Sequence, residues 1–478
     1  MITHGRRYEF FAAPVQPGKD SLMMNRLRCM ALAAMLIPAA AGAQDLAAGV
    51  RAYNAGDHAA AVREFLPAAE QGNATAQFNM GILHERGHGV DQDDDLAAKW
   101  YRVAADQGHV GAQRLLGQMY RDGRGVPQDE AAAVRWFTAA AEQGDARAQL
   151  SLGSMYARGN GVEQDDAAAL RWYTAAAEQG NIVAQRSVGV MYRDGRGAPQ
   201  DGAAAVRWFT AAAEQGDAQA QLSLGVMYKR GRGIERDQVE AIRWLTAAAE
   251  QGNVSAQNEL AGLYRFASGE MRDEAEAAKW YRAAAEQGDA SAQGSLGNLY
   301  AFGRGVPQNY AEAVRWYTAA AEQGDPTAQT NLGRMYEQGR GVAQDHAEAV
   351  RWYRAAVERS DARARYQLAN MYLHGRGVET DAAEAAQLYR RAARQGNVRA
   401  QVALGMLLER GTGVPTDLVS SYMWFEVSLR DFVVRDEETT NAATEARDRV
   451  AQRLSASEFA QAQDRVEACK AQRYRYCD

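Results

Sequence analysis

Apolar side chains recur along most of the chain at the spacing of amphipathic helices. In residues 145–180, a first apolar set falls at i, i+4, i+7 and i+8, and a second set falls at i, i+3, i+4, i+7 and i+8. Each set lines one face of a helix, so the unit predicts two helices, named here helix A and helix B. The two sets are Ala148, Leu152, Met155 and Tyr156, then Ala169, Trp172, Tyr173, Ala176 and Ala177.

Glycine and short polar residues predict where these helices begin and end. Asp165 or Asp166 carries an acceptor that can cap helix B, and Asn181 can cap the next helix A. Gly159 and Gly180 stand where a left-handed residue ends a helix. Because each stop is followed closely by a start, the pattern predicts antiparallel helices joined by tight turns.

Tryptophan gives the period of the pattern. Neighbouring tryptophans are 36 residues apart, with Leu388 in the one gap. This period is typical of helical solenoids, in which each helix pair buries its apolar face against its neighbours. The sequence predicts an all-α fold, an α/α solenoid superhelix of helix-turn-helix repeats with a C-terminal helical cap. The tryptophans are Trp100, Trp136, Trp172, Trp208, Trp244, Trp280, Trp316, Trp352 and Trp424.

Two further expectations concern the core. We expect the tryptophans to be buried between units, with truncation of the central Trp208 costing more than truncation of Trp424 beside the cap. Gly153 recurs in the middle of helix A, where glycine costs up to about 1 kcal/mol relative to alanine. A Trp or Tyr ring lying over the bare backbone would explain that glycine.

The pattern divides the chain into four parts. Residues 1–43 form an upstream extension and signal peptide, 44–72 a partial repeat, 73–432 ten repeats, and 433–478 a capping helix and tail. Ser455 and Glu458 have the spacing of a capping box, which predicts a helix that ends near Cys469. The alternative is a mobile tail, because the segment "RDEETTN" is polar enough to be disordered.

The N-terminal segment predicts export. Residues 24–43 combine a basic start, an apolar stretch and a small-residue cleavage site, so the mature chain should begin at Gln44, with translation starting at Met23 or Met24. The alternative is an apolar first helix of the fold. We therefore expect a periplasmic or secreted protein, in which an oxidising compartment would join Cys469 and Cys477 in a disulfide rather than leave two free thiols.

The repeated string A-x-x-x-L-G-x-M-Y-x-x-G-x-G-V, followed by A-x-x-W-Y-x-x-A-A-E-Q-G, resembles the Sel-one-like repeat family, which is related to the tetratricopeptide class. Units 253–288 and 361–396 depart from it: the first has "RFASGEM" in its loop, and the second lacks the Trp and follows Ser360 in place of Gly. The resemblance implies a scaffold that binds proteins or extended peptides, and regulation of a sensor or a cell-envelope process.

The net charge of the chain limits the classes of partner that it can bind. Residues 44–478 carry 49 basic and 58 acidic side chains, a net charge of −9, which gives no footprint for nucleic acid. After the signal segment no apolar run is long enough to span a membrane. We expect a monomer whose partner is a protein or an extended peptide in the envelope.

The sequence contains two motifs that resemble functional sites of enzymes, but their position in the repeat argues against both. "HERGH" at 84–88 fits a zinc-protease pattern, but Gly87 should end the helix, so His84 and His88 would not share one helical face. A chance metal contact by these histidines and the acidic run 91–95 is the alternative. The repeated "GRGV" follows a helix rather than a strand, unlike a nucleotide loop. We therefore predict no catalytic residues, metal or cofactor; the alternative function is an envelope hydrolase acting on cell wall or a lactam.

Residues that vary between repeats are the candidate partner-binding residues, because a ligand that is not repetitive needs a surface that is not. Helix A should line the inner groove of the solenoid, and two of its positions vary while their neighbours do not. The alternative is that these positions are merely solvated. The candidates are Gln118, Ser154, Glu259, Asn298, Asn331, Arg334, Tyr366, Gln367 and Asn370.

Overall fold

The computed structural model describes residues 46–267, 269–430, 437–471 and 477. The predicted signal segment and its cleavage site lie outside these residues. The chain divides into two compact units: Met1–Ala148 with Asn160–Val162, and Gln149–Gly159 with Glu163–Asp478. Each unit consists of helices, and no strand occurs in the described ranges. The all-α prediction is therefore confirmed.

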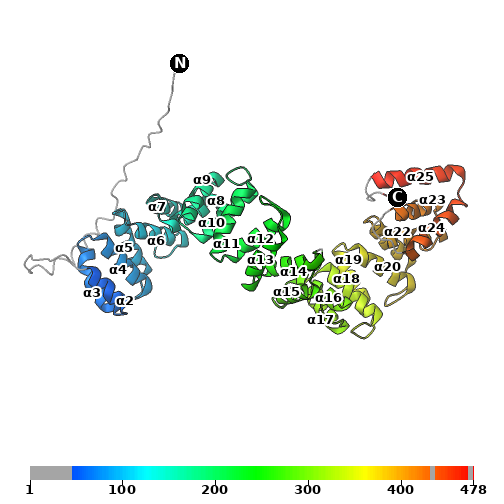
Figure 1. The fold of residues 1–478 in the computed structure, drawn as a ribbon, viewed down its shortest axis with the longest axis horizontal. Helices are drawn as coiled ribbons and strands as arrows, with labels where there is room; N and C mark the ends of the chain where they lie inside the picture. Colours follow the sequence, from blue (N-terminus) through cyan, green and yellow to red (C-terminus); the bar gives the residue numbers. More distant parts are fainter. Residues whose placement is uncertain (1–45, 268, 431–436, 472–476, 478) are drawn as a thin grey trace, which may run out of the picture. The chain divides into compact units, whose positions relative to one another are not determined.

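Helices of nearly constant length follow one another along the chain (Figure 1). Even-numbered helices up to α22 are helices A, odd-numbered helices up to α23 are helices B, and the helices of a unit pack against each other. The bounds are α2 (Leu46–Asn54), α3 (His58–Glu70), α4 (Ala74–Arg86), α5 (Asp94–Asp106), α6 (Val110–Asp122), α7 (Glu130–Glu142), α8 (Ala146–Arg158), α9 (Asp166–Glu178), α10 (Ile182–Asp194), α11 (Gly202–Glu214), α12 (Ala218–Arg230), α13 (Gln238–Glu250), α14 (Val254–Phe266), η1 (Gly269–Met271), α15 (Glu274–Glu286), α16 (Ala290–Phe302), α17 (Tyr310–Glu322), α18 (Pro326–Gln338), α19 (His346–Glu358), α20 (Ala362–His374), α21 (Ala382–Ala393), α22 (Val398–Arg410), α23 (Leu418–Arg430), α24 (Glu437–Ala451) and α25 (Ala456–Ala471).

The helix ends carry the caps that the sequence predicts. Asp165 is the N-cap of α9, and its carboxylate accepts hydrogen bonds from the backbone N–H groups of Ala167 and Ala168. The Asn181 side chain caps α10 by accepting from the Ala184 N–H at 3.0 Å. Each cap satisfies an N–H group that the first turn of a helix leaves unpaired.

An aromatic ring packs against most of the mid-helix glycines, as predicted, but it is a Tyr or Phe ring and not the Trp ring; at Gly225 the side chain of Leu245 takes its place. A Cβ atom at Gly153 would lie 2.7 Å from the ring of Tyr173, the residue that follows Trp172. Phe209 occupies the same place over Gly189. Glycine therefore lets helix B approach helix A closely at these positions.

The expected ranking of the tryptophans is wrong. Trp208, in the middle of the chain, is only half-buried, because the ring of Phe209 fills the close contact between the helices. Trp424 on α23 is 1% exposed, because α22, α24 and α25 all pack on that helix. The tryptophan beside the cap is thus buried more deeply than the central one.

A ladder of buried glutamines links successive repeats, and the sequence analysis missed it. The Gln221 side chain donates to the Ala213 carbonyl at 3.1 Å, and its Oε1 accepts from Nε2 of Gln251 at 2.8 Å. Each glutamine thereby satisfies a backbone carbonyl and a neighbouring amide in a buried place. The same amide pair recurs as Gln107–Gln77, Gln143–Gln113, Gln179–Gln149, Gln215–Gln185, Gln287–Gln257 and Gln323–Gln293.

The ladder stops at the unit that contains α20. Arg359 and Arg365 stand at the two positions that are glutamine in the preceding units. As a result, Oε1 of Gln329 is buried with no hydrogen-bond partner within the described part of the chain. Ser360, in place of the usual glycine, has φ 66° and is the one non-glycine residue with a positive φ in the described ranges. Backbone strain of this kind costs about 1 to 3 kcal/mol.

Two helices follow the last repeat, one more than predicted. Both α24 and α25 pack on α23 (Figure 1). The predicted capping box is present at the start of α25: Glu458 accepts from the Ser455 backbone N–H at 2.8 Å, and the Ser455 hydroxyl accepts from the Glu458 N–H at 3.3 Å. The first of these helices was missed because its sequence is polar, with only Ala443, Ala446 and Val450 buried.

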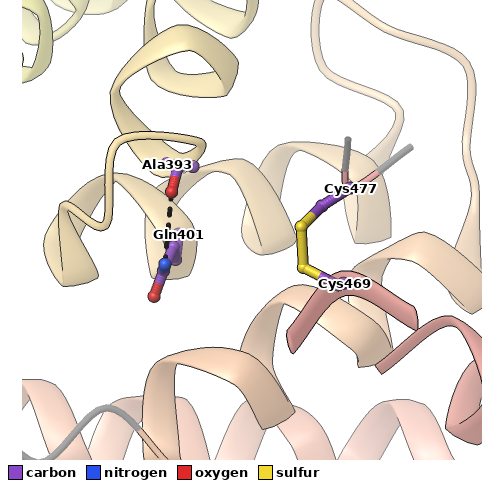
Figure 2. The surroundings of a disulfide bond; sticks show 4 residues. All are labelled: Ala393, Gln401, Cys469 and Cys477. Atoms are coloured by element: carbon purple, nitrogen blue, oxygen red, sulfur yellow. Dashed lines mark hydrogen bonds between the residues drawn. A yellow bond between two sulfur atoms is a disulfide. The ribbon is translucent and has the colours of Figure 1, made fainter. Parts of the chain in front are cut away.

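The disulfide between Cys469 and Cys477 holds the end of the chain against the last repeats. Both cysteines are buried in the core cluster that contains Ala393 of α21 and Trp424. Figure 2 shows this disulfide together with the hydrogen bond from Gln401 to the Ala393 carbonyl. In the described ranges, no helix is both long and apolar enough to cross a bilayer.

Candidate binding pocket on helices A

An open pocket of about 380 Å³ lies on the helices A of the second unit. Its walls come from α18, α20 and the start of α22, so it follows one face of three successive repeats. Its lining is polar and basic, with no carboxylate. The residues are Thr330, Asn331, Arg334, Arg363, Tyr366, Gln367, Gly396, Asn397, Val398 and Arg399.

Four of the nine candidate partner-binding residues meet in this pocket: Asn331, Arg334, Tyr366 and Gln367. Arg334 is half-buried, and no carboxylate of the described residues lies within ion-pair distance of it. Arg363 lies 3.4 Å from Asp361, with 57% of its side chain exposed. Of the guanidinium groups in the pocket, the protein neutralises that of Arg363 weakly and leaves that of Arg334 without a paired carboxylate of the described residues.

Two other candidates, Asn298 and Asn370, have internal roles. Oδ1 of Asn298 accepts from the Tyr317 hydroxyl at 2.8 Å and from Nδ2 of Asn331 at 3.2 Å. Oδ1 of Asn370 accepts from the Tyr389 hydroxyl at 2.7 Å. Each asparagine thus satisfies a tyrosine of its own repeat. This position is polar because the tyrosine opposite it on helix B needs a hydrogen-bond acceptor. Variation within one sequence cannot distinguish that internal role from ligand binding.

Arg334 occupies the same repeat position as Asn298 and Asn370, but it does not accept a hydrogen bond from the tyrosine of its own repeat. Opposite it, the Tyr353 hydroxyl donates to Glu337 at 2.7 Å. Burial raises the pKa of Tyr353, and the Glu337 carboxylate raises it further. Because Glu337 already accepts the hydrogen bond of the Tyr353 hydroxyl, the Arg334 side chain is available to the pocket.

The three remaining candidates lie elsewhere. Glu259 lines a separate pocket of about 560 Å³ on α12 and α14, and forms an ion pair with Lys229 at 2.7 Å. Ser154 lies beside Tyr173, whose pKa is raised by burial and lowered in part by this hydroxyl. Gln118 is half-buried on α6 in the first unit.

The histidines of "HERGH" are placed as the sequence predicts. α4 ends at Arg86, and Gly87 follows with φ 66°, so His84 and His88 are not on one helical face. Burial lowers the pKa of His84, and Nδ1 of His88 lies 3.3 Å from the Tyr53 hydroxyl. Across the residues that the structure describes, no group of three or more His, Cys, Asp or Glu is arranged to hold a metal ion.

Sequence reasoning also missed residues of the pocket. Arg363, Asn397 and Arg399 were not among the candidates, although a signal was present. Residues 326–399 contain twelve arginines and eight carboxylates, a net charge of +4 in a chain that is acidic as a whole. This local excess of arginine would have pointed to this stretch of the chain, although only four of the twelve arginines lie on its helices A.

Successive helical hairpins of constant length define a repeat protein of the α-solenoid class, and three of its helices A line the polar pocket. The chain belongs to the Sel1 repeat family. Ten Sel1 repeats match it from residue 74 to residue 428, at 74–109, 110–145, 146–181, 182–217, 218–253, 254–289, 290–325, 326–361, 362–397 and 398–428.

A solved structure agrees with this assignment. A protective antigen present in uropathogenic Escherichia coli strains, with an SLR fold, is 36% identical to this chain; 92% of each chain is covered, with a TM-score of 0.78. A Sel1 repeat protein from Oxalobacter formigenes is 32% identical over 51% of this chain and 97% of its own, with a TM-score of 0.44. No curated protein is similar enough to add a further relative.

Proposed function

We propose that the protein is a non-catalytic scaffold of the bacterial envelope, which binds another protein or an extended peptide through the pocket on α18, α20 and α22. The convergence of Asn331, Arg334, Tyr366 and Gln367 carries this proposal. These side chains differ from repeat to repeat, yet two successive repeats present them to one open space. Solenoids bind partners on extended surfaces of this kind.

Three observations support an envelope location. Residues 24–43 have the composition of a secretory signal. Cys469 and Cys477 form a disulfide, which persists in oxidising compartments. The similar Escherichia coli protein is a protective antigen. Cell fractionation with N-terminal sequencing should find the chain in the periplasm or medium, beginning near Gln44; cytosolic chain that retains residues 24–43 would contradict export.

Site-specific crosslinking tests the binding surface. A photocrosslinking amino acid at position 367 should join the partner in intact cells. The same amino acid at position 315, on the exposed face of α17, is the matched control, because 68% of the Arg315 side chain is exposed. Crosslinks from 315 but not from 367 would overturn the assignment of the pocket. Hydrolysis of a lactam or of cell wall by the purified chain would instead favour an enzyme.

A further inference from the structure

We infer that the pocket of α18, α20 and α22 recognises an acidic stretch of a peptide, with Arg334 and Arg363 each binding a carboxylate. The inference rests on the proposed function and deepens it by naming the chemistry of the ligand. Four features support the inference. They are the weak pairing of Arg334 and Arg363, the helix N-terminus beside them, the net positive charge of residues 326–399, and the two side-chain amides in the pocket.

Arg334 is the central group. Its guanidinium is half-buried and, in the described part of the chain, has no carboxylate within ion-pair distance. A partly desolvated charge without a counter-charge is costly, and a ligand carboxylate can pair with both edges of a guanidinium. Binding of an anion would therefore remove an unfavourable feature of the free protein.

Arg363 lies across the pocket on the next helix A. Its Nη2 atom is 3.4 Å from Asp361 and 3.2 Å from the Thr327 hydroxyl, and its side chain is 57% exposed. An exposed pair of this kind contributes about 0 to 1 kcal/mol, so a ligand carboxylate can compete with Asp361. Arg399 completes the basic lining from the third helix A.

The N-terminus of α22 adds positive electrostatic potential to the pocket. Asn397 caps this helix by accepting from the Ala400 N–H at 2.9 Å, and Asn397, Val398 and Arg399 line the pocket. The N-terminus of a helix carries a partial positive charge and exposes backbone N–H groups. Next to two arginines, it extends the basic wall along the path of a ligand.

The surrounding charge favours the same ligand. Residues 326–399 carry a net charge of +4, whereas residues 44–478 together carry −9. The pocket is therefore the basic part of an acidic protein, a distribution that attracts acidic ligands and repels basic ones. The pocket on α12 and α14 is different, because there Glu259 neutralises Lys229.

The amides between the arginines favour a peptide. Nδ2 of Asn331 donates to Asn298, which leaves Oδ1 of Asn331 as an acceptor for a peptide N–H. Oε1 of Gln367 accepts from Asn370 at 3.4 Å, which leaves Nε2 of Gln367 as a donor to a peptide carbonyl. The ring of Tyr366 packs on Tyr389 at a tilt and lines the pocket beside these amides.

The probes are fluorescein-labelled decapeptides of glutamate, glutamine and lysine, added to the full chain and followed by fluorescence anisotropy. The glutamate peptide should bind at least about tenfold more tightly than the glutamine peptide, and its affinity should fall as salt rises. The double substitution Arg334→Ala/Arg363→Ala should weaken binding of the glutamate peptide at least about tenfold. Circular dichroism melting checks that this variant is folded.

The matched control is Arg315→Ala/Arg351→Ala, which removes two arginines from helices B of neighbouring repeats. Their side chains are 68% and 59% exposed and lie outside the pocket, so binding should change less than about twofold. Equal weakening in both double variants would overturn the inference, because it would mean general charge attraction. Equal binding of the glutamine peptide would also overturn it.

Stronger competition by polygalacturonate than by the glutamate peptide would assign the pocket to an acidic glycan and overturn the inference. If crosslinks form at position 367 while the glutamate peptide does not bind, the ligand chemistry is wrong and the scaffold function stands. If neither occurs, the proposed function fails as well.

Discussion

The repeats from α10 to α15 and the repeats from α18 to α23 have the same helix pairs but treat their buried polar groups differently. In the first region, Gln221 and its equivalents satisfy one another and the backbone in an unbroken ladder. In the second, Arg359 and Arg365 replace two ladder glutamines, and Oε1 of Gln329 is left unpaired. Only the second region contains the basic pocket. The difference indicates that the ladder is lost where the arginines gather and not wherever a repeat is irregular, because unit 253–288 keeps its Gln287–Gln257 pair.

Tryptophan burial differs between the middle of the chain and its end, not between the two regions as a whole, because Trp280 of the first region and Trp352 of the second are both 8% exposed. Trp208 in the first region is half-buried, whereas Trp424 in the second is 1% exposed beneath α24 and α25. The chain end is therefore closed by a covered aromatic core. This arrangement places the covered core next to the repeats whose polar ladder is broken.

The largest expected effect concerns these tryptophans. Trp424→Ala opens a cavity under α24 and α25 and should lower the free energy of unfolding by about 3 to 5 kcal/mol. Trp208→Ala removes a side chain that is only half-buried and should cost about 1 to 2 kcal/mol. Urea titration followed by circular dichroism measures both. A larger loss at Trp208 would show that the regular repeats, not the chain end, hold the tighter core.

A smaller effect is expected from the ladder. Gln221→Ala removes two hydrogen bonds, one to the Ala213 carbonyl and one from Nε2 of Gln251, and should cost about 2 to 3 kcal/mol. The matched change, Arg365→Ala, removes a half-buried side chain whose Nε has no partner, and should cost less than about 1 kcal/mol. The same urea titration compares the two variants. Similar costs would show that the ladder does not distinguish the two regions.

Much of the fold could be predicted because its information is local and repeated. The spacing of Trp172 and Tyr173 with the alanines of helix B, and caps such as Asp165, specify each hairpin independently of distant residues. The glutamine ladder was missed because its bonds join residues 30 positions apart, such as Gln221 and Gln251, and periodicity alone does not reveal them. α24 was missed because so few of its residues are buried.

The binding pocket could be predicted only in part, for a physical reason. Variation at one repeat position selects Asn298, Arg334 and Asn370 alike. Only their partners separate them, because Asn298 and Asn370 accept from tyrosine hydroxyls, whereas Glu337 satisfies Tyr353 and leaves Arg334 to the pocket. Such a distinction depends on contacts between helices.

Restoring the ladder should reduce the difference between the regions. In Arg359→Gln/Arg365→Gln, a glutamine at 359 can donate to the unpaired Oε1 of Gln329, and the second change removes a guanidinium whose pKa is lowered by burial and by Arg391. The double variant should be more stable by about 1 kcal/mol, the contribution of one buried hydrogen bond. Thermal melting measures the gain. A loss of stability would mean that Arg359 and Arg365 already make stabilising contacts that the glutamines cannot replace.

The smallest expected effect tests how α24 substitutes for a further repeat. The carboxylate of Glu337 faces Arg376 of the next repeat at 3.9 Å, and Glu409, two repeats later, is paired by Arg449 of α24 at 2.8 Å. The hydrogen bond from Arg449 lowers the pKa of Glu409 below its ordinary value. A carboxyl whose folded pKa is lowered stabilises the fold fully above the unfolded pKa of about 4.3, and this contribution disappears as pH falls through the folded value.

Glu409→Gln should therefore lower stability by about 1 kcal/mol at pH 7, since half of the Arg449 side chain is exposed and solvent weakens the pair. At pH 3 the variant and the parent chain should differ less, because the parent has begun to lose the same charge. Glu240→Gln, in the exposed pair with Arg243 on α13, is the control and should change little at either pH. Urea titrations at the two pH values measure the difference. A cost for Glu409→Gln that is the same at pH 3 and pH 7 would mean that α24 is held by packing alone and does not reproduce the ionic contact between repeats.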